Sequence, residues 1–297
     1  MLIAGPPLYR VMRDLKPDEV SAIYEDLEAT YQLEWRRRGH RSMHLGYYDN
    51  EDQDPGEAAK NTVRLLSEAV GINSGDRVLN VGCGAGEGAV WNARERNATV
   101  LGVDIGERQL ELARENAREH GVEDRVSFAL DNFHELESVP DDSMDVVWGL
   151  EALSHSPDRA GALEQFCRVL TADGKVAFTD IFLRSPTDDD RVREVEEALG
   201  LRLGTIDAFE RALDETGFEE ICVRDETDGV RPSTESRRQF ARVAHPVGRV
   251  LGAVGLVTER QLDAFRASSL VHELVEESLL GYYLVTAERG KTPIDTD

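Results

Sequence analysis

Apolar residues in the middle of the chain follow two spacings in turn, one typical of strands and one typical of helices. Short apolar runs predict buried strands, and apolar positions three or four residues apart predict helices. The predicted strands cover residues 78–81, 99–103, 126–130, 144–150, 175–181, 220–224 and 279–287. The predicted helices cover residues 17–38, 57–70, 86–97, 107–120, 160–170 and 206–216. This alternation indicates a parallel sheet with helices on both of its faces.

The alternation weakens after Leu183. Residues 186–190 are acidic and rich in turn-forming types, whereas residues 226–275 are mostly helical. Within that helical region, the apolar stretch 247–257 suits either an apolar binding pocket or ordinary core. We expect these later segments to add something to the sheet rather than to extend its alternating pattern.

A glycine-rich loop joins the first predicted strand to the helix that follows it. The segment VLNVGCGAGEG places Gly82, Gly84 and Gly86 at alternate positions. Glycines let a backbone turn tightly and approach a ligand, and the helix start behind them offers unpaired N–H groups. Such a loop also occurs in proteins that bind nothing, so the residues around it decide what it means.

Polar residues follow the next two predicted strands. Asp104 ends the second strand, eighteen residues after Gly86, where a carboxylate can accept both ribose hydroxyls of an adenosine cofactor. Asp131 and Asn132 follow the third strand and suit the adenine amino group, and Phe133 suits the adenine ring. A helix N-cap is the alternative role for Asp104 taken alone. Together these strand ends favour a cofactor that contains adenosine.

A nicotinamide dinucleotide is the competing cofactor. Its binding loop prefers the spacing G-x-G-x-x-G, whereas the glycines here stand at positions 82, 84, 86 and 88. Glu87 at the helix start would repel a pyrophosphate but is compatible with the cationic sulfur of S-adenosylmethionine (SAM). Spacing and charge therefore favour SAM.

Five segments resemble the successive motifs of class I SAM-dependent methyltransferases. They are VLNVGCGAGEGAV, VLGVDI, DNFHEL, DDSMDVVWGLEALSHSPD and VLTADGKVAFTDIF, and the resemblance is good over about residues 40–185. Within this family, MHLGYYD, EALSHSPD, FTDIF and GYYLVTAER are similar to the group of sarcosine/dimethylglycine, tocopherol and sterol methyltransferases.

The resemblance implies an α/β fold with a Rossmann-like, mostly parallel seven-stranded sheet, helices on both faces and helical cap segments. It also implies transfer of a methyl group from SAM to a small molecule. The acceptor stays open between a sarcosine- or glycine-type amine and a quinone, tocopherol or prenyl ring or lipid.

The resemblance also assigns roles to single positions. The residues implied to hold SAM are Tyr47, Tyr48, Gly82, Cys83, Gly84, Gly86, Asp104, Ile105, Asp131, Asn132, Phe133, Leu150 and Glu151. Among them, Leu150 and Glu151 would border the sulfonium, and the two tyrosines would close the site from the N-terminal side. Asn80 and Asn132 depart from the family, which often has an acidic residue there; both keep hydrogen-bonding capacity without the charge.

Methyl transfer from a sulfonium is an in-line displacement, in which the protein supplies alignment and excludes water. A base is needed only when the acceptor must first lose a proton. Glu151, His155 and His44 are the candidates to orient or deprotonate the acceptor. The alternatives are a satisfied loop histidine for His155 and a lid contact for His44. Asp180 either faces the acceptor or caps the following turn.

A protein that binds SAM without transferring its methyl group is a second hypothesis. Such a protein would have no need of polar residues such as Glu151, His155 and Tyr47 around the methyl position. A nicotinamide-dependent oxidoreductase is a third hypothesis, and equilibrium binding of SAM against NAD separates it from the first.

The charge of the chain bears on its partners. The net charge is −24, which disfavours nucleic acid and anionic membrane surfaces. No apolar run is long enough for stable membrane insertion. Lysine occurs only at positions 16, 60, 175 and 291, and such an acidic, lysine-poor composition indicates either adaptation to high salt or an ordinary acidic protein.

We expect three parts along the chain: residues 1–60 with N-terminal helices and a lid, residues 61–185 as the SAM-binding core, and residues 186–297. The last part would complete the sheet and carry a helical acceptor-binding insertion at about 226–278. Three cysteines without metal-ligand spacing and a start unlike a secretory signal favour the cytoplasm and no bound metal. The oligomeric state stays open, with a homodimer as one option.

Overall fold

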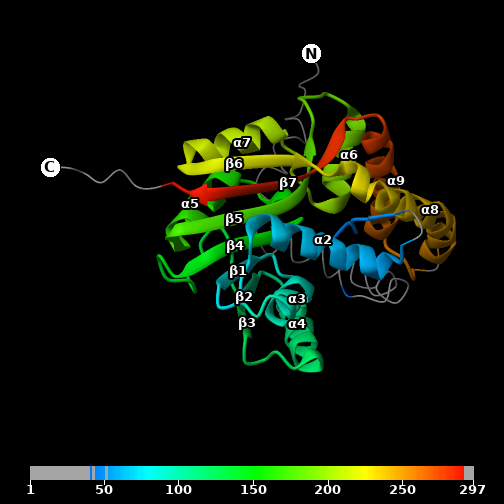
Figure 1. Cartoon of the computed structure of the whole chain (residues 1–297). Coiled ribbons are helices and arrows are strands. Elements are labelled where there is room, and N and C mark those ends of the chain that lie inside the picture. The colour runs from blue at the N-terminus through cyan, green and yellow to red at the C-terminus, as the bar shows by residue number, and fades with distance from the viewer. Residues whose placement is uncertain (1–40, 42–43, 51–52, 254, 291–297) are drawn as a thin grey trace, which may run out of the picture.

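One seven-stranded sheet organises the part of the chain that the computed structural model describes, which is residues 41, 44–50, 53–253 and 255–290 (Figure 1). The strands are β1 (Arg77–Val81), β2 (Thr99–Asp104), β3 (Val126–Leu130), β4 (Met144–Leu150), β5 (Leu170–Leu183), β6 (Phe218–Asp225) and β7 (Leu280–Arg289). Their order is β3-β2-β1-β4-β5-β7-β6. Only β7 is antiparallel, to both β5 and β6, and the other neighbouring strands are parallel. The predicted mostly parallel sheet is confirmed.

Helices cover both faces of the sheet. They are α2 (Pro55–Val70), α3 (Glu87–Glu95), α4 (Glu107–His120), the short 3-10 helix η3 (Leu153–His155), α5 (Arg159–Val169), α6 (Asp190–Leu199), α7 (Ile206–Glu215), α8 (Thr227–Gly252) and α9 (Glu259–Glu276). Buried residues of α2, α3 and α4 share one apolar cluster, and those of α5 and α7 share the cluster on the opposite face. The predicted helix 17–38 lies outside the described residues.

The helix ends follow local chemistry. The Asp54 carboxylate accepts the Gly56 N–H at 2.8 Å and Pro55 begins α2, so the helix starts two residues before the predicted position 57. Gly71 ends α2 and Gly121 ends α4, both in the left-handed conformation that favours glycine. Where such signals are present, the predicted and observed boundaries agree closely.

Parts of the prediction were wrong, among them one missed helix and the bounds of the fifth strand, which begins at Leu170 rather than at residue 175. Asp189, in the acidic stretch predicted as turn, caps α6 by accepting the Arg191 N–H at 2.9 Å, and the sequence pattern did not predict this helix. The fifth strand was predicted to end at Ile181. It continues to Leu183 because the antiparallel β7 pairs with it that far, opposite Leu280. The strand end depends on pairing with a segment distant in sequence, whereas the cap of α6 is a local contact.

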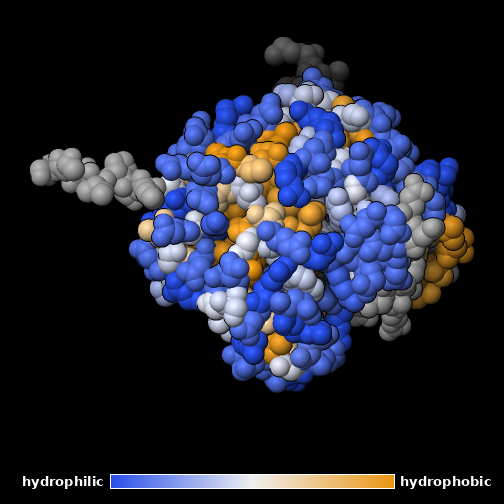
Figure 2. All heavy atoms as spheres, viewed as in Figure 1, coloured by the Kyte–Doolittle hydropathy of each residue, from blue (hydrophilic) through white to orange (hydrophobic). Residues whose placement is uncertain are grey.

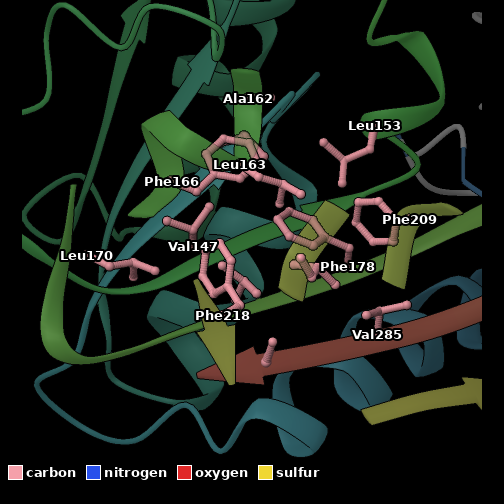
Figure 3. Close-up of a cluster of buried hydrophobic side chains, with 14 of the residues drawn as sticks. Val147, Leu153, Ala162, Leu163, Phe166, Leu170, Phe178, Phe209, Phe218 and Val285 are labelled. Atoms are coloured by element: carbon pink, nitrogen blue, oxygen red, sulfur yellow. The ribbon is translucent and has the colours of Figure 1, made fainter. Parts of the chain in front are cut away.

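Aromatic side chains fill the core on the face covered by α5 and α7 (Figure 3). The ring centroids of Phe166 and Phe178 lie 5.5 Å apart, and those of Phe182 and Phe209 lie 5.1 Å apart. On the other face, Trp148 of β4 is buried against the cluster shared by α2 and α3. Dense packing on both faces fixes the carboxyl ends of the strands relative to one another.

The C-terminal half of α8 leaves apolar side chains exposed. Val247 and Val250 of α8 are 54% and 71% exposed, and Leu256 in the following loop is 72% exposed. Hydrophobic residues gather at the edge of the molecule where α8 lies (Figure 2). The interpretation of residues 247–257 as ordinary core is therefore wrong. No helix among the described residues is long and apolar enough to cross a bilayer.

Candidate active site

The glycine loop between β1 and α3 has the backbone that its sequence predicts. Gly82, Gly84 and Gly86 have φ angles of 59°, 51° and 78°, in the left-handed region that disfavours side chains. A Cβ atom at Gly82 would lie 2.8 Å from the Cβ of Ala152, and one at Gly86 would lie 2.9 Å from the Cβ of Ala113. Both conformation and space therefore require glycine at these two positions.

The carboxylate of Asp104 supports this loop from the end of β2. Its Oδ2 accepts the Gly84 N–H at 2.8 Å, and its Oδ1 accepts the Gly106 N–H at 2.9 Å. Burial raises the pKa of Asp104, and these backbone donors oppose that rise. Gly106 is the N-cap residue of α4. The alternative role of Asp104 as a helix N-cap is therefore wrong.

A cavity of about 310 Å³ lies beside the loop, at the carboxyl ends of the strands. One side, which we call the glycine-loop half, is formed by Gly82, Cys83, Gly84, Asp104, Ile105, Asp131 and Phe133. The other side, which we call the helical half, is formed by Leu199, Leu201, Thr234, Arg237, Phe240, Ala241, Ala264, Phe265, Ser268 and Val271. His44, Leu150, Glu151, His155 and Asp180 also line the cavity. It therefore joins most of the predicted site residues to α6, α8 and α9.

Four predicted site residues do not line this cavity. Gly86 caps α3 behind the loop, and the side-chain oxygen of Asn132 accepts the N–H of His134 at 3.1 Å. Tyr47 packs against the cluster that contains Tyr282, and the Tyr48 N–H binds the Gly229 carbonyl oxygen at 2.8 Å. The contacts of these four residues with SAM stay predictions, and the structure shows them beside the cavity lining rather than in it.

Several residues that line the cavity carry no signal in the sequence. Arg237 and Phe240 lie on α8, and Phe265 lies on α9. Apolar and basic residues alternate here with the spacing of any amphipathic helix. Only the packing of α8 on α9 therefore shows that these residues line the cavity. Asn80, identified as a departure from the family, lines the cavity and donates from its side chain to the Trp148 carbonyl oxygen at 3.3 Å.

Glu151 stands where the two halves meet. Its φ angle of 49° is unusual for a residue with a side chain, and such strain concentrates at functional sites. Its Oε1 accepts the Leu45 N–H at 2.6 Å, which ties the segment 44–48 to the cavity. Burial raises the pKa of Glu151 to about 7, against the positive charge of Arg237 and this hydrogen bond. The carboxyl group is thus poised to gain or lose a proton near neutral pH.

His155 and Asp180 form a second titratable pair in the cavity wall. The Nδ1 of His155 lies 3.1 Å from the Gly200 carbonyl oxygen, and because a carbonyl only accepts, Nδ1 carries the proton in this contact. Burial lowers the pKa of His155, which favours its neutral form. The Asp180 carboxylate accepts the N–H groups of Ser154 at 2.7 Å and Ile181 at 2.8 Å, and burial raises its pKa.

His44 has a contact that fits the lid interpretation. Its Nε2 donates to the Ala59 carbonyl oxygen of α2 at 3.0 Å, and the side chain is buried. Thr62 of α2 also binds this segment, because its hydroxyl donates to the Leu45 carbonyl oxygen at 2.8 Å. His44 therefore helps to hold residues 44–48 on α2 as one wall of the cavity.

Similarity to known proteins decides the family. A family described as a methyltransferase domain matches residues 72–217. The 27-O-demethylrifamycin SV methyltransferase of Amycolatopsis mediterranei is 34% identical over 279 residues, which span 92% of this chain and 97% of that protein. The chain belongs to the SAM-dependent methyltransferases. The methyltransferase uses SAM as its methyl donor and a small molecule as its acceptor.

Further similarities agree with this family. The sarcosine/dimethylglycine N-methyltransferase of Halorhodospira halochloris is 29% identical to this chain. The aligned residues cover 76% of this chain and 78% of the Halorhodospira protein. The solved structure of the cyclase SpnF shares the fold, with a TM-score of 0.78 and 24% identity over 93% of this chain and 97% of that one. The match to the methyltransferase domain and the two curated methyltransferases support the methyltransferase prediction rather than a non-catalytic SAM-binding protein or a nicotinamide-dependent oxidoreductase.

Proposed function

We propose that the methyltransferase methylates a hydroxyl oxygen of an apolar small molecule bound in the helical half of the cavity. The observation that carries this proposal is the lining of that half. Leu199, Leu201, Phe240, Phe265 and Val271 make most of its wall apolar. A ring system or branched chain would bury these side chains, whereas a sarcosine-sized zwitterion would leave them without contacts. The name of the rifamycin relative, a methyltransferase of 27-O-demethylrifamycin SV, supports the same acceptor atom.

The glycine-loop half suits SAM, which supplies an electrophilic methyl group when it is bound. Each carboxylate oxygen of Asp104 holds one backbone N–H and keeps a lone pair for a ribose hydroxyl. A Cβ atom at Gly84 would meet no protein atom within 4 Å, so the backbone here borders space that the methionine part would fill. Asp131 and Phe133 would hold the adenine, and Leu150 with Glu151 would border the sulfonium.

His155 is the proposed base for the acceptor hydroxyl. Its neutral ring carries the proton on Nδ1, so the lone pair lies on Nε2 and can accept a proton as the oxygen attacks. Asp180 would stabilise the resulting imidazolium, because its charge raises the pKa of His155. Glu151 would orient the acceptor from the opposite side. Tyr47, Tyr48 and His44 would hold the N-terminal wall rather than touch the reacting atoms.

The base is tested by His155→Ala, with 1-naphthol as an apolar acceptor and sarcosine as the small polar one. We expect the wild type to form the naphthyl methyl ether, and the variant to lose roughly 100- to 10,000-fold in kcat while it binds S-adenosylhomocysteine unchanged. The wild-type rate should fall on acidification only below the ordinary histidine pKa, because the pKa of His155 is lowered. Faster turnover of sarcosine, or a variant within threefold of wild type, would contradict the proposal.

We propose that the three parts expected from the sequence have separate roles in binding SAM and the acceptor. Residues 61–185 would hold SAM, and residues 1–60 together with 186–278 would choose the acceptor. The arrangement of α6, α8 and α9 around the helical half supports this division. Exchange of residues 186–278 with those of a relative should change the preferred acceptor and leave SAM affinity intact.

We propose that the acidic composition is an adaptation to high salt, and that the methyltransferase works in the cytoplasm. The net charge of −24 supports the adaptation to high salt. The three cysteines are all free, which supports a reducing compartment. We expect the midpoint of thermal unfolding to rise as potassium chloride is raised from millimolar to molar concentration, because salt screens repulsion among the carboxylates. A midpoint that does not change would indicate an ordinary acidic protein.

A further inference from the structure

The first residue of α5, Arg159, is in an unusual place for a basic side chain. The helix begins there, directly after its N-cap residue Asp158, and the helix dipole disfavours a positive charge at this end. The side chain is also partly buried, and burial lowers the pKa of its guanidinium. Neither the helix nor the solvent explains an arginine here, so the explanation lies in the contacts of its side chain.

Backbone carbonyl groups of two different segments accept hydrogen bonds from this guanidinium. Its Nε donates to the Leu153 carbonyl oxygen of η3 at 3.1 Å, and its Nη2 donates to the Arg202 carbonyl oxygen in the loop after α6. The same two segments also meet directly, because the Arg202 N–H donates to the Ser154 carbonyl oxygen at 2.6 Å. The rigid guanidinium fork suits such a bridge between two acceptors. Arg159 therefore fastens η3 to residues 200–204.

The surroundings of Arg159 hold its guanidinium in this bridge. Its Cζ lies 5.6 Å from the ring centroid of Phe182, a buried residue of β5, which is a cation–π distance. A Cβ atom at Gly204 would lie 2.7 Å from Nη1 of Arg159, so glycine leaves the room that the side chain needs. The negative charges of Asp180 and Glu196 oppose the fall in the pKa of Arg159. The guanidinium is thus balanced within the protein.

The two segments that Arg159 joins are the two that hold the ring of His155. His155 is the last residue of η3, and its Nδ1 donates to the Gly200 carbonyl oxygen at 3.1 Å. One end of this hydrogen bond therefore lies on each segment. If the segments moved apart by about 1 Å, the hydrogen bond would be lost, and the proton would no longer be held on Nδ1.

We infer that Arg159 is a positioning residue for the proposed base, because it keeps η3 and residues 200–204 together and so keeps the proton of His155 on Nδ1. This inference rests on the proposed function. Arg159 is absent from the described residues that line the cavity, whereas His155 is one of them. Arg159 would therefore act through His155 and not by touching the acceptor or SAM.

Methylation of 1-naphthol by variants of the full chain tests this role. We expect kcat to fall roughly 10- to 100-fold in Arg159→Gln, with KM within twofold, because the base is misplaced while the acceptor pocket stays intact. Arg159→Lys keeps the charge but cannot hold both carbonyl groups, so its kcat should fall about as far. The matched control is Arg168→Gln at the other end of α5, which should stay within twofold of wild type. Arg168 also donates to two backbone carbonyl groups, those of Val139 at 3.1 Å and Leu136 at 3.0 Å.

Two further measurements show whether the effect passes through His155. In a chain that already carries His155→Ala, adding Arg159→Gln should cost less than about threefold in kcat. NMR spectra of the ring nitrogens, with the His155 signals identified by their loss in His155→Ala, should show the Nδ1–H tautomer in the wild type. Arg159→Gln and Arg159→Lys should show a mixture of both tautomers.

Three results would overturn the inference: full additivity of the substitutions at Arg159 and His155, an unchanged tautomer in both Arg159 variants, or wild-type turnover by Arg159→Lys. Affinity for S-adenosylhomocysteine confirms that each variant is folded, and Arg159→Lys carries the test if Arg159→Gln fails to bind it. Failure of the proposed function would be seen differently. His155→Ala would then keep its turnover within threefold of wild type, while the tautomer of His155 would still depend on Arg159.

Discussion

The two halves of the cavity are built in different ways. The glycine-loop half consists of strand ends and the short loops that follow them, between Gly82 and Phe133. Hydrogen bonds of the parallel sheet fix the positions of these ends. The helical half consists of side chains from α6, α8 and α9 together with Leu201 just after α6, which are held by packing of helix on helix. Strand ends can present the same cofactor site in many relatives, whereas the faces of packed helices can vary with the acceptor.

The largest expected effect comes from removing the carboxylate of the glycine-loop half. Asp104→Ala should weaken binding of S-adenosylhomocysteine by roughly 100- to 1,000-fold, because two charge-assisted hydrogen bonds to the ribose are lost. The Gly84 N–H would also lose its acceptor. Isothermal calorimetry measures this effect. As a control, Asp145→Ala removes a carboxylate that pairs with Arg77 at 2.8 Å outside the cavity, and should leave the affinity within twofold.

A second effect concerns Glu151, where the two halves meet. Its pKa is about 7 in the folded protein and near 4.5 in the unfolded chain, so between these pH values the folded state holds a proton that the unfolded state has released. The protonated Glu151 carboxyl group therefore favours the folded state most at the low end of this pH window. Its contribution to the free energy of unfolding is lost as pH rises through about 7. Relative to Glu151→Gln, the wild type should lose roughly 3 kcal/mol of unfolding free energy from pH 4.5 to 8.

Urea unfolding of both proteins across that pH range, without a ligand, gives the difference directly. The comparison with Glu151→Gln cancels the titration of other carboxyl groups, including Asp104 and Asp180, whose pKa values are also raised by burial. Parallel curves for the two proteins would mean that the pKa of Glu151 is the same in the folded and unfolded states, and would contradict its raised pKa in the cavity.

The smallest of the three effects should be confined to the helical half. Phe240→Ala should raise the KM of an apolar acceptor about tenfold, because the aromatic contact is lost, and should leave the Kd of S-adenosylhomocysteine within twofold. Val243→Ala is the matched control on the same helix, since Val243 is 69% exposed. It should change neither constant. A large change in cofactor affinity for Phe240→Ala would show that the two halves do not act independently.

The sequence determined the sheet, the glycine loop and the place of Asp104. Strand and helix periodicities are local, so seven strands could be located without any knowledge of their neighbours. The left-handed φ angles at Gly82, Gly84 and Gly86 are likewise local, and the glycines in the sequence indicate them. Asp104 follows from position alone, because the end of β2 lies beside the end of β1 in any sheet of this order.

Only the tertiary structure decided where the remaining side chains point. Asn132 satisfies the His134 N–H in its own loop, and Arg237 lines the cavity while Arg238 pairs with Glu235. Residues 247–257 read as apolar in the sequence, yet Val250 is 71% exposed. The places of Arg237 and Val250 depend on which distant segments pack against α8, whereas the contacts of Asn132 and Arg238 are with residues two and three positions away. Local periodicity carries no such information, because one helical pattern serves a core, a cavity wall or an exposed face equally well.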